Sequence, residues 1–412
     1  MNTLQQIVKQ EPINVIYTSS YIPRQCGLAT YTKDLTNAIN LLNSHSLAEI
    51  LTVTPSGENI DYPWESKFKI NHLDLPDYVG AAEYVNRSHA DLVSLQHEFG
   101  LFGGDYGEYI VYFAEALKIP LVTTFHTVLG EPSEKQREII QRLAKKSQAI
   151  IVMMEQVAQK LVSIYKVPRE KIVVIPHGVP DIPFNATSMQ KRKHKLADRI
   201  VLGNINLLDP NKGIEYALEA VALLAKKYSN VLYMVIGQTH PDLIKKEDEN
   251  YRKFLKKRVR ELGISHNVRF INKYLSLAEL INWLKVIDVY ITPYLEPQQA
   301  TSGALAYAIG AGRACVSTPY IYAKEVLEEG RGVLVPFRDS ESIANAVTDL
   351  LEHPDKSKEM ATRAYKFGRL MTWPNVAQSH LTLFHTILRK NDRPKKIIAP
   401  YTLSGSLLPS GQ

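Results

Sequence analysis

Short apolar segments alternate with longer amphipathic segments along most of this 412-residue chain. Residues 149–154 are apolar throughout, whereas residues 31–42 place their apolar side chains at helical spacing. Strands that are apolar on both faces and alternate with helices form parallel sheets covered by helices on both sides. The pattern therefore predicts a doubly wound α/β fold.

The alternation is interrupted over residues 175–195, where proline, polar and basic residues are frequent, as is typical of a linker. A second series of segments follows, and an amphipathic helix is expected over residues 373–390. The sequence thus predicts two domains, over residues 1–180 and 195–370. The expected strands are residues 13–20, 47–53, 90–98, 119–127, 149–154 and 171–178, then 199–206, 231–238, 268–275, 288–295, 314–319 and 332–337.

The composition is that of a globular protein, with 45% hydrophobic and 22% charged residues. Two cysteines, Cys26 and Cys315, are too few for a disulfide framework, which favours a reducing compartment. No apolar run reaches the roughly 18 residues of a membrane span, and the N-terminal segment does not read as a secretory signal. The net charge of +7 favours anionic partners. We therefore expect a cytoplasmic protein.

Ligands of open parallel sheets bind beyond the carboxyl ends of the strands, so the residues at these ends are the first candidates for a site. Gly27 follows the first expected strand and directly precedes a helix. The backbone N–H groups of such a helix start can receive a phosphate. A plain strand-to-helix turn explains Gly27 equally well, and both interpretations stay open.

Histidines end two further strands of the first series. His97 and Glu98 precede a loop with four glycines, and they would suit a general acid–base pair. A solvated glycine loop is the alternative, and zinc is not expected because the H-E-x-x-H spacing is missing. His126 ends the strand over residues 119–127, where a structural and a catalytic role are both open.

In the second series, Lys212 and Gly213 stand at the start of a helix. A lysine beside free helix N–H groups can bind a diphosphate, although the G-x-x-x-x-G-K-[ST] phosphate loop is missing. A solvated lysine in a turn is the alternative. Ser302 and Gly303 open a later helix in the same way.

Gln238 and His240 follow the strand over residues 231–238. They would suit a contact with the base or ribose of a nucleotide. A simple turn of the chain is the alternative.

Together these residues resemble the retaining glycosyltransferases of family 4, also called glycosyl transferase group 1, over nearly the whole chain. The matching motifs are PRQCGLAT after the first strand, TTFHT with His126, the linker IPHGVPD, the Lys212–Gly213 pair and the helix start TWPNVAQ. The resemblance implies a GT-B fold of two facing Rossmann-like domains. It also implies that the helix over residues 373–390 crosses back to the first domain.

Three positions depart from the family pattern. The two glutamates of an E-x7-E motif correspond to Gln299 and Tyr307, and Asn206 stands about where an arginine often accompanies the lysine. Gln299 can still hydrogen-bond sugar hydroxyls, whereas Tyr307 offers a ribose a single hydroxyl. Gln299 and Tyr307 fit a subgroup pattern, Q-x-x-S-G-x-L-x-Y-A with S-T-P-Y-x-Y-A.

The resemblance implies transfer of a hexosyl group, with mannose or glucose favoured, to a saccharide or lipid-linked acceptor with retention of configuration. The donor would be a nucleotide-diphosphate sugar of UDP or GDP type, and neither a metal nor another cofactor is implied. The implied catalytic residues are His126, Lys212 and Gln299. The implied donor-binding residues are Gly27, Lys212, Gln238, His240, Ser302, Gly303 and Tyr307. His97 and Glu98 would form the acceptor side.

Other functions remain open at this point. The missing carboxylates motivate a catalytically inactive GT-B protein that binds a nucleotide sugar or glycan as a sensor or partner subunit. A GT-B phosphorylase or epimerase is a second alternative, although no pyridoxal-binding lysine can be located. Basic runs over residues 191–195 and 253–260 would suit nucleic acid, but the second has the spacing of a solvated helix face. Residues 134–146 leave open a peripheral contact with an anionic membrane.

Overall fold

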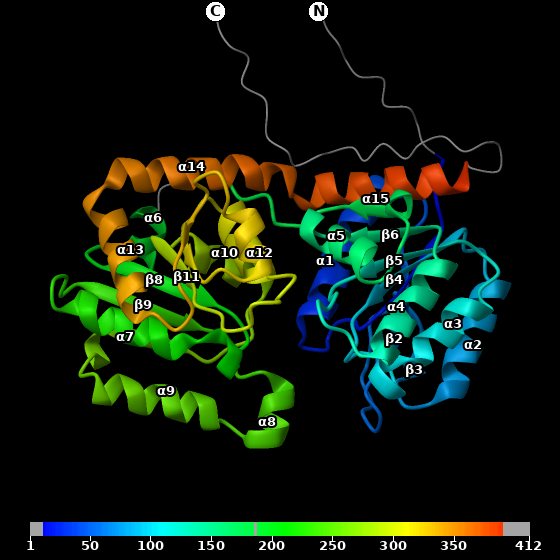
Figure 1. The fold of residues 1–412 in the computed structure, drawn as a ribbon, viewed down its shortest axis with the longest axis horizontal. Helices are drawn as coiled ribbons and strands as arrows, with labels where there is room; N and C mark the ends of the chain where they lie inside the picture. Colours follow the sequence, from blue (N-terminus) through cyan, green and yellow to red (C-terminus); the bar gives the residue numbers. More distant parts are fainter. Residues whose placement is uncertain (1–10, 185–187, 390–412) are drawn as a thin grey trace, which may run out of the picture. The chain divides into compact units, whose positions relative to one another are not determined.

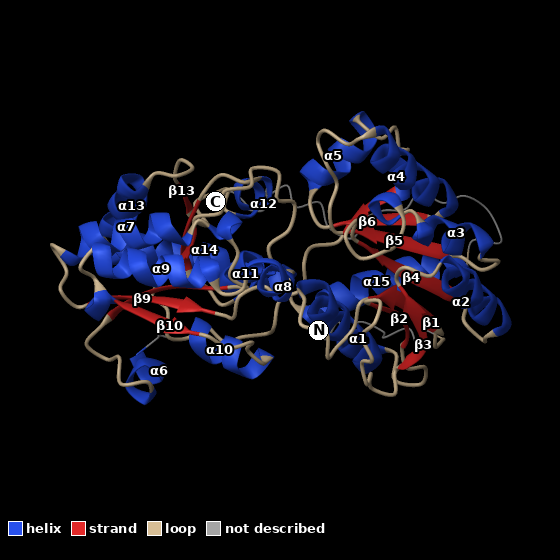
Figure 2. Cartoon of the chain, turned by 90° about the horizontal axis from the view of Figure 1, so that it is seen from below, coloured by secondary structure: helices blue, strands red, loops and turns tan. Residues whose placement is uncertain are grey.

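The computed structural model describes residues 11–184 and 188–389, and the chain divides into two compact units. The first unit comprises the residues up to Ile175 and those from Ala377 onward, and the second comprises Pro176–Val376. Each unit is built on one parallel sheet (strands red in Figure 2) with helices on both faces (Figure 1). The expected doubly wound α/β architecture is confirmed.

The sheet of the first unit has the strand order β3-β2-β1-β4-β5-β6-β7. Its strands are β1 (Val15–Ser19), β2 (Glu49–Thr54), β3 (Ser66–Asn71), β4 (Leu92–His97), β5 (Leu121–Phe125), β6 (Ala149–Val152) and β7 (Ile172–Val174). Its helices include α1 (Gly27–Leu42), α2 (Leu75–Arg87), α3 (Tyr109–Ala116), α4 (Glu134–Lys146) and α5 (Glu155–Ser163). The order of the strands reverses between β1 and β4, which is where ligands of such sheets bind.

The sheet of the second unit has the order β10-β9-β8-β11-β12-β13 and reverses between β8 and β11. Its strands are β8 (Ile200–Ile205), β9 (Val231–Ile236), β10 (Val268–Ile271), β11 (Val289–Thr292), β12 (Ala314–Ser317) and β13 (Val333–Leu334). Its helices include α6 (Ser188–Lys193), α7 (Ile214–Ala225), α8 (Pro241–Glu247), α9 (Asn250–Glu261), α10 (Leu277–Leu284), α11 (Gly303–Gly310), α12 (Ile321–Val326), α13 (Ser340–Glu352) and α14 (Pro354–Leu370).

Helix α15 (Trp373–Leu388) begins in the second unit, and its residues from Ala377 onward group with the first unit. The segment after β7 is tied to the start of this helix. Val179 donates its backbone N–H to Met371 at 2.8 Å and accepts that of Trp373 at 2.9 Å. The tryptophan that the sequence places at the helix start is therefore held by the linker.

Two glycines bring α11 and α14 into backbone contact. A Cβ atom added to Gly368 of α14 would lie 2.7 Å from the Cα atom of Gly310 in α11. Such a distance leaves no room for any side chain at Gly368. The position of α11 in the second unit thus depends on this contact.

Two elements differ from the sequence-based expectations. Strand β3 was not expected, because its exposed Lys67 and Lys69 alternate with only partly buried residues and leave no apolar run. Helix α1 includes Gly27, which was expected to precede the helix directly, because the Cys26 side chain accepts the backbone N–H of Ala29 and caps the helix.

Candidate active site

Lys212 lies at the carboxyl end of β8, beside the point where the second sheet reverses. The short helical turn Pro210–Lys212 precedes Gly213, whose φ of 60° is left-handed. A Cβ atom at Gly213 would lie 2.1 Å from the carbonyl oxygen of Pro293, so only glycine fits between the turn and α7. The backbone geometry at Gly213 therefore fixes where Lys212 leaves the turn.

The ammonium group of Lys212 rests on an aromatic ring. Its Nζ atom lies 4.2 Å from the centre of the Tyr294 ring, which is a cation–π contact. In the described part of the chain, Lys212 has no ion pair with a carboxylate. Burial lowers the pKa of Lys212 to about 8, and the charge of Asp209 opposes this shift only in part. The ammonium is thus held in place with its charge uncompensated.

Tyr294 is itself fixed by two neighbours. Its hydroxyl group donates to Oδ1 of Asn206 at 2.7 Å, and its ring stacks on Tyr320 with 5.1 Å between the ring centres. Asn206 stands where the family pattern often has an arginine. Here it orients the ring beneath Lys212 and supplies no charge of its own.

The start of α11 lies close to this group. Ser302 is the N-terminal cap of the helix, and its Oγ atom accepts the backbone N–H of Leu305 at 3.2 Å. Burial raises the pKa of Tyr294 well above its usual value, and the Ser302 side chain acts in the opposite direction. The structure therefore brings Lys212, Ser302 and Gly303 together around Tyr294.

His177, which the sequence analysis did not single out, lies against the same helix start. A Cβ atom on Gly303 would be 3.2 Å from its Nε2 atom, and its ring centre is 6.0 Å from that of Tyr307. The Nδ1 atom of His177 is paired with the carbonyl oxygen of Gly178 at 2.8 Å. The linker motif P-H-G was the available signal, but it was interpreted only as a connection between domains.

The two residues that replace the family glutamates have different surroundings. The Nε2 atom of Gln299 donates to the backbone oxygen of Thr301 at 2.9 Å, so this amide supports the loop before α11. Tyr307 is buried within α11 beside His177. Neither residue supplies a negative charge.

Gln238 and His240 lie on a loop after β9, and a buried arginine holds this loop. The Nη2 atom of Arg252 donates to the backbone oxygen of Gly237 at 2.9 Å, and its Nε atom donates to Glu249 at 3.0 Å. The side chains of Gln238 and His240 are both partly exposed. Their predicted contact with the donor remains a prediction.

In the first unit, His126 follows β5 and is nearly buried. Its Nε2 atom is 3.0 Å from Oε1 of Gln96, and its ring meets the edge of Tyr31 with 4.8 Å between the ring centres. These contacts tie the end of β5 to β4 and α1. They are compatible with the structural and the catalytic interpretation alike.

Glu98 and His97 are neighbours in sequence but have unlike environments. The carboxylate of Glu98 accepts the Thr127 hydroxyl at 2.8 Å and the backbone N–H of Phe99 at 3.1 Å. Burial raises the pKa of this carboxyl, and the two hydrogen bonds oppose the rise. Glu98 would therefore be easier to protonate than an exposed glutamate.

His97 does not suit its predicted contact with an acceptor. It is completely buried, and its ring lies within 6 Å of the rings of Phe99, Phe102 and Phe125. Both ring nitrogens are buried without a hydrogen-bond partner among the described residues. Burial lowers the pKa of His97 to about 3, so the ring is neutral. The sequence H-E suggested a general acid–base pair, but the three phenylalanines enclose the histidine.

Gly27 is the first residue of α1, at the carboxyl end of β1. No atom lies within 4 Å of the place where its Cβ would be, so the space beside it is open. This openness would suit a ligand contact.

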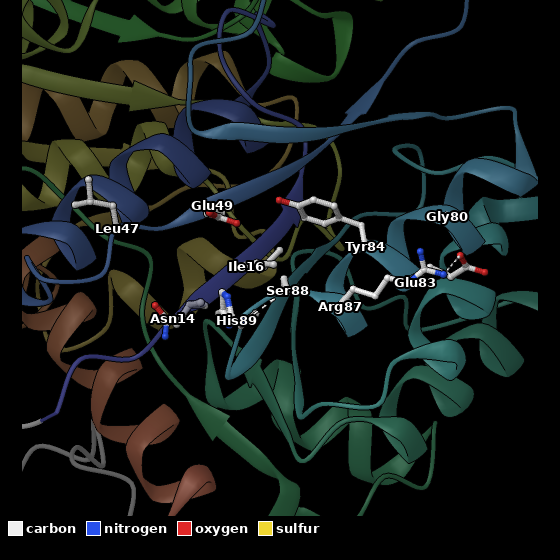
Figure 3. A pocket seen from close by; sticks show the side chains of 12 residues that line it. Asn14, Ile16, Leu47, Glu49, Gly80, Glu83, Tyr84, Arg87, Ser88 and His89 are labelled. Atoms are coloured by element: carbon white, nitrogen blue, oxygen red, sulfur yellow. Dashed lines mark hydrogen bonds and ion pairs between the residues drawn. The ribbon is translucent and has the colours of Figure 1, made fainter.

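A cavity of about 530 Å³ lies at the opposite end of the first sheet (Figure 3). It is lined by the amino-terminal ends of β1 and β2 and by α2, where Glu83 and Arg87 form an exposed ion pair. None of the predicted site residues lines it. Because ligands of such sheets bind at the carboxyl ends, we do not place the active site there.

Two expectations concern metals and membranes. Residues 11–184 and 188–389 contain no group of three or more histidine, cysteine, aspartate or glutamate side chains that could hold a metal ion. None of the helices within these residues is long and apolar enough to cross a membrane. The apolar residues of α4 pack into the core, so the membrane contact considered for this helix stays a prediction.

Comparisons with known proteins follow the same division of the chain. Residues 186–367 match the family "Glycosyl transferases group 1", and residues 43–181 match "Glycosyltransferase Family 4". A D-inositol 3-phosphate glycosyltransferase of Kineococcus radiotolerans is 24% identical over 76% of this chain and 77% of its own. A phosphatidyl-myo-inositol mannosyltransferase of Mycolicibacterium smegmatis is 23% identical over 66% of this chain and 67% of its own.

Solved structures show the same fold at low sequence identity. Anabaena HepE in complex with UDP has a TM-score of 0.70 at 16% identity, covering 91% of this chain and 100% of HepE. Sucrose-phosphate synthase from Thermosynechococcus elongatus has a TM-score of 0.73 at 16% identity, covering 92% of this chain and 99% of the synthase. Sequence families and fold agree, and the chain belongs to the group 1, family 4 glycosyltransferases with the GT-B fold.

Proposed function

We propose that this glycosyltransferase moves a hexosyl group, mannose or glucose, from a nucleotide-diphosphate sugar to a saccharide or lipid-linked acceptor. The donor is of UDP or GDP type, the anomeric configuration is retained, and no metal takes part. The observation that carries this proposal is the ammonium of Lys212, which lies over Tyr294 beside the start of α11 and has no ion pair within residues 11–184 and 188–389.

In this proposal, the leaving diphosphate is stabilised by the second unit. Lys212 supplies a point charge, and the first backbone N–H groups of α11, at Gly303 and beyond, supply a dipole. Electrostatic stabilisation of this kind is usually the largest contribution to catalysis. The loop with Gln238 and His240 would contact the nucleoside, and Arg252 would keep that loop in place.

The sugar and the acceptor are proposed from the relatives' names. One of them is a mannosyltransferase of phosphatidyl-myo-inositol, and another is an alpha-monoglucosyldiacylglycerol synthase of Streptococcus pneumoniae. These names favour mannose or glucose and a polar or lipid-linked acceptor. Glu98, with its raised pKa, would lie on the acceptor side.

A second candidate is a catalytically inactive protein that binds a nucleotide sugar or a glycan. Gln299 and Tyr307 favour it, because they leave the donor sugar and the ribose without the carboxylates of the family pattern. The two candidates share nucleotide binding but differ in product formation.

Thermal unfolding with UDP, GDP and ADP tests the shared step. A ligand at a hundredfold its dissociation constant adds about 2.7 kcal/mol of stability, so one nucleotide should raise the unfolding midpoint clearly. Lys212→Ala should lose this rise. Lys256→Ala, which removes an exposed lysine of α9 in the same unit, should keep it. Equal shifts in both variants would remove Lys212 from the site.

Product analysis then separates the two candidates. The nucleotide that binds identifies the base of the donor, and the corresponding sugar donors are incubated with inositol phosphate and diacylglycerol acceptors. Transfer of sugar would exclude the inactive candidate, and NMR of the new linkage would report retention or inversion. Nucleotide binding without transfer to any acceptor, and without hydrolysis of the donor, would favour the inactive candidate.

A further inference from the structure

The cavity at the amino-terminal ends of β1 and β2 has the size and the lining of a small-molecule site. Its volume of about 530 Å³ lies within the range of roughly 300–1,000 Å³ that is usual for ligand sites. Apolar residues form part of its wall, among them Val15, Ile16 and Leu47, and polar side chains form another part. The cavity would therefore suit a ligand that has both apolar and hydrogen-bonding surfaces.

Some of the polar residues around the cavity build its frame. Asn14 donates its backbone N–H and its side-chain amide to Asp91 at 2.8 and 3.1 Å. Its Oδ1 atom accepts the Ser46 hydroxyl at 2.5 Å. The Ser88 hydroxyl accepts the backbone N–H of Ala90 at 3.1 Å. These bonds join the start of β1 to the loop before β4, so the shape of the cavity is set by the protein itself.

Glu49 places a carboxylate in the wall of the cavity. It is the first residue of β2 and is half-buried. Within residues 11–184 and 188–389, Glu49 makes no ion pair with a lysine, arginine or histidine. Because burial removes part of the water around a carboxylate, Glu49 gains from a hydrogen-bond donor in the cavity.

Tyr84 faces this carboxylate from α2. Its hydroxyl group points toward Glu49 (Figure 3). Phe68 packs against the Tyr84 ring with 5.7 Å between the ring centres, which holds the ring in position. Burial raises the pKa of Tyr84, and the charge of Glu49 adds to the rise, so the hydroxyl keeps its proton. The cavity thus presents a carboxylate and a hydroxyl group that face each other.

A second pair of polar groups lies on the same helix. Arg87 and Glu83 line the cavity one helical turn apart and form an ion pair at 3.3 Å. Both side chains are largely exposed, so the pair contributes little to stability and still offers N–H groups and lone pairs to a ligand. With Glu49, the lining contains two carboxylates and one guanidinium, a net charge of −1 when His89 is neutral. This charge disfavours an anionic ligand.

We infer that this cavity is a second binding site, which takes a neutral saccharide at the amino-terminal edge of the first sheet. The C–H faces of a pyranose ring would cover the apolar wall. Its hydroxyl groups would donate to Glu49 and Glu83. The Arg87 guanidinium and the Tyr84 hydroxyl would donate to the oxygens of the sugar.

Other classes of ligand match this lining less well. An anion is repelled by the net charge, and an organic cation would leave the guanidinium of Arg87 and the apolar wall unmatched. The inference does not depend on the proposed transfer reaction, because none of the proposed donor and acceptor residues lines the cavity.

Calorimetric titration of the full chain without nucleotide tests the inference. Maltose is the neutral probe, D-glucuronate the anionic probe and spermidine the cationic probe. Maltose should bind at millimolar concentration, and the other two probes should bind more weakly. Glu49→Gln should weaken maltose binding about tenfold, because the amide keeps one acceptor oxygen and loses the charge. Tyr84→Phe removes one hydroxyl and should weaken maltose binding about threefold.

Glu138→Gln and Tyr112→Phe are the matched controls, because both residues are exposed on helices of the same unit and lie outside the cavity. They should bind maltose as the wild type does, and equal unfolding midpoints would show that all four variants are folded. The inference is overturned if maltose does not bind the wild type, or if Glu49→Gln binds maltose as tightly as Glu138→Gln. Tighter binding of spermidine or glucuronate than of maltose would also overturn it.

Hydrogen exchange locates the bound saccharide without any substitution. Maltose should slow the exchange of residues 80–90, which line the cavity or lie between lining residues. Slower exchange of residues 97–104 or 206–213 alone would place the maltose at the proposed acceptor or donor residues and overturn the inference. Glu49→Gln should bind nucleotide as the wild type does. Absence of nucleotide binding in the wild type would count against the proposed function alone.

Discussion

Nucleotide binding should weaken as the pH rises through 8, because the charge of Lys212 is lost there. Burial lowers the pKa of Lys212 to about 8 in the free protein. The group is protonated below this pKa and neutral above it, so its attraction for a diphosphate is present at pH 7 and absent at pH 9. The protonated fraction falls from about 0.9 to about 0.1 between these values, which corresponds to a tenfold weaker association, or about 1.4 kcal/mol.

Calorimetry with the nucleotide diphosphate that binds, between pH 7.0 and 9.0 at constant ionic strength, measures this loss. The second ionisation of a phosphate lies near pH 6, so the charge of the diphosphate group stays nearly constant over the range. Lys212→Arg keeps its charge up to a pKa of about 12.5 or higher and should give a flat curve. Lys212→Gln should bind weakly and also without pH dependence.

Two results would refute the reasoning. A flat wild-type curve would mean that Lys212 is either not buried as described or not in contact with the diphosphate. The same decline in Lys212→Arg as in the wild type would assign the titration to another group.

Two further predictions concern stability. Gly213→Ala should lower the free energy of unfolding by about 3 kcal/mol, because the new Cβ would meet the Pro293 oxygen. Gly263 is also left-handed but has open space around it, so Gly263→Ala should lower the free energy of unfolding by only about 1 kcal/mol. Urea unfolding of both variants checks this, and equal losses would contradict it. Burial lowers the pKa of both His97 and His380 to about 3. Between pH 7 and 5 the unfolded chain therefore binds protons at these histidines that the folded first unit cannot bind. Each histidine should lower the free energy of unfolding by about 2 kcal/mol over this range. His97→Phe should lose less stability on acidification than the wild type, and an unchanged dependence of the free energy of unfolding on pH would count against this account.

The fold was largely predictable from the sequence because most strands are buried on both faces. Strands such as β6 and β9 are apolar runs that no solvated segment would carry. Strand β3 was not predicted because it lies at the edge of its sheet, where only Ile70 among its residues is fully buried. Helix α6 lies within the segment interpreted as a linker, where its short basic sequence gives no periodic signal.

The candidate site was predictable only in part, because side-chain environments depend on residues distant in sequence. The lysine at the helix start is visible in the sequence, but the ring beneath Lys212 comes from Tyr294, 82 positions later. His97 is likewise enclosed in part by Phe125, 28 positions later.

The contact between Gly310 and Gly368 gives a distant position influence over the proposed donor site. Any side chain at Gly368 would displace α11, and Ser302 at the other end of that helix would move with it. A lineage could therefore lose activity by genetic drift at a position that touches no ligand, while every predicted binding residue is retained. An intact set of site residues in a natural variant would then be an incomplete guide to whether that variant still catalyses transfer.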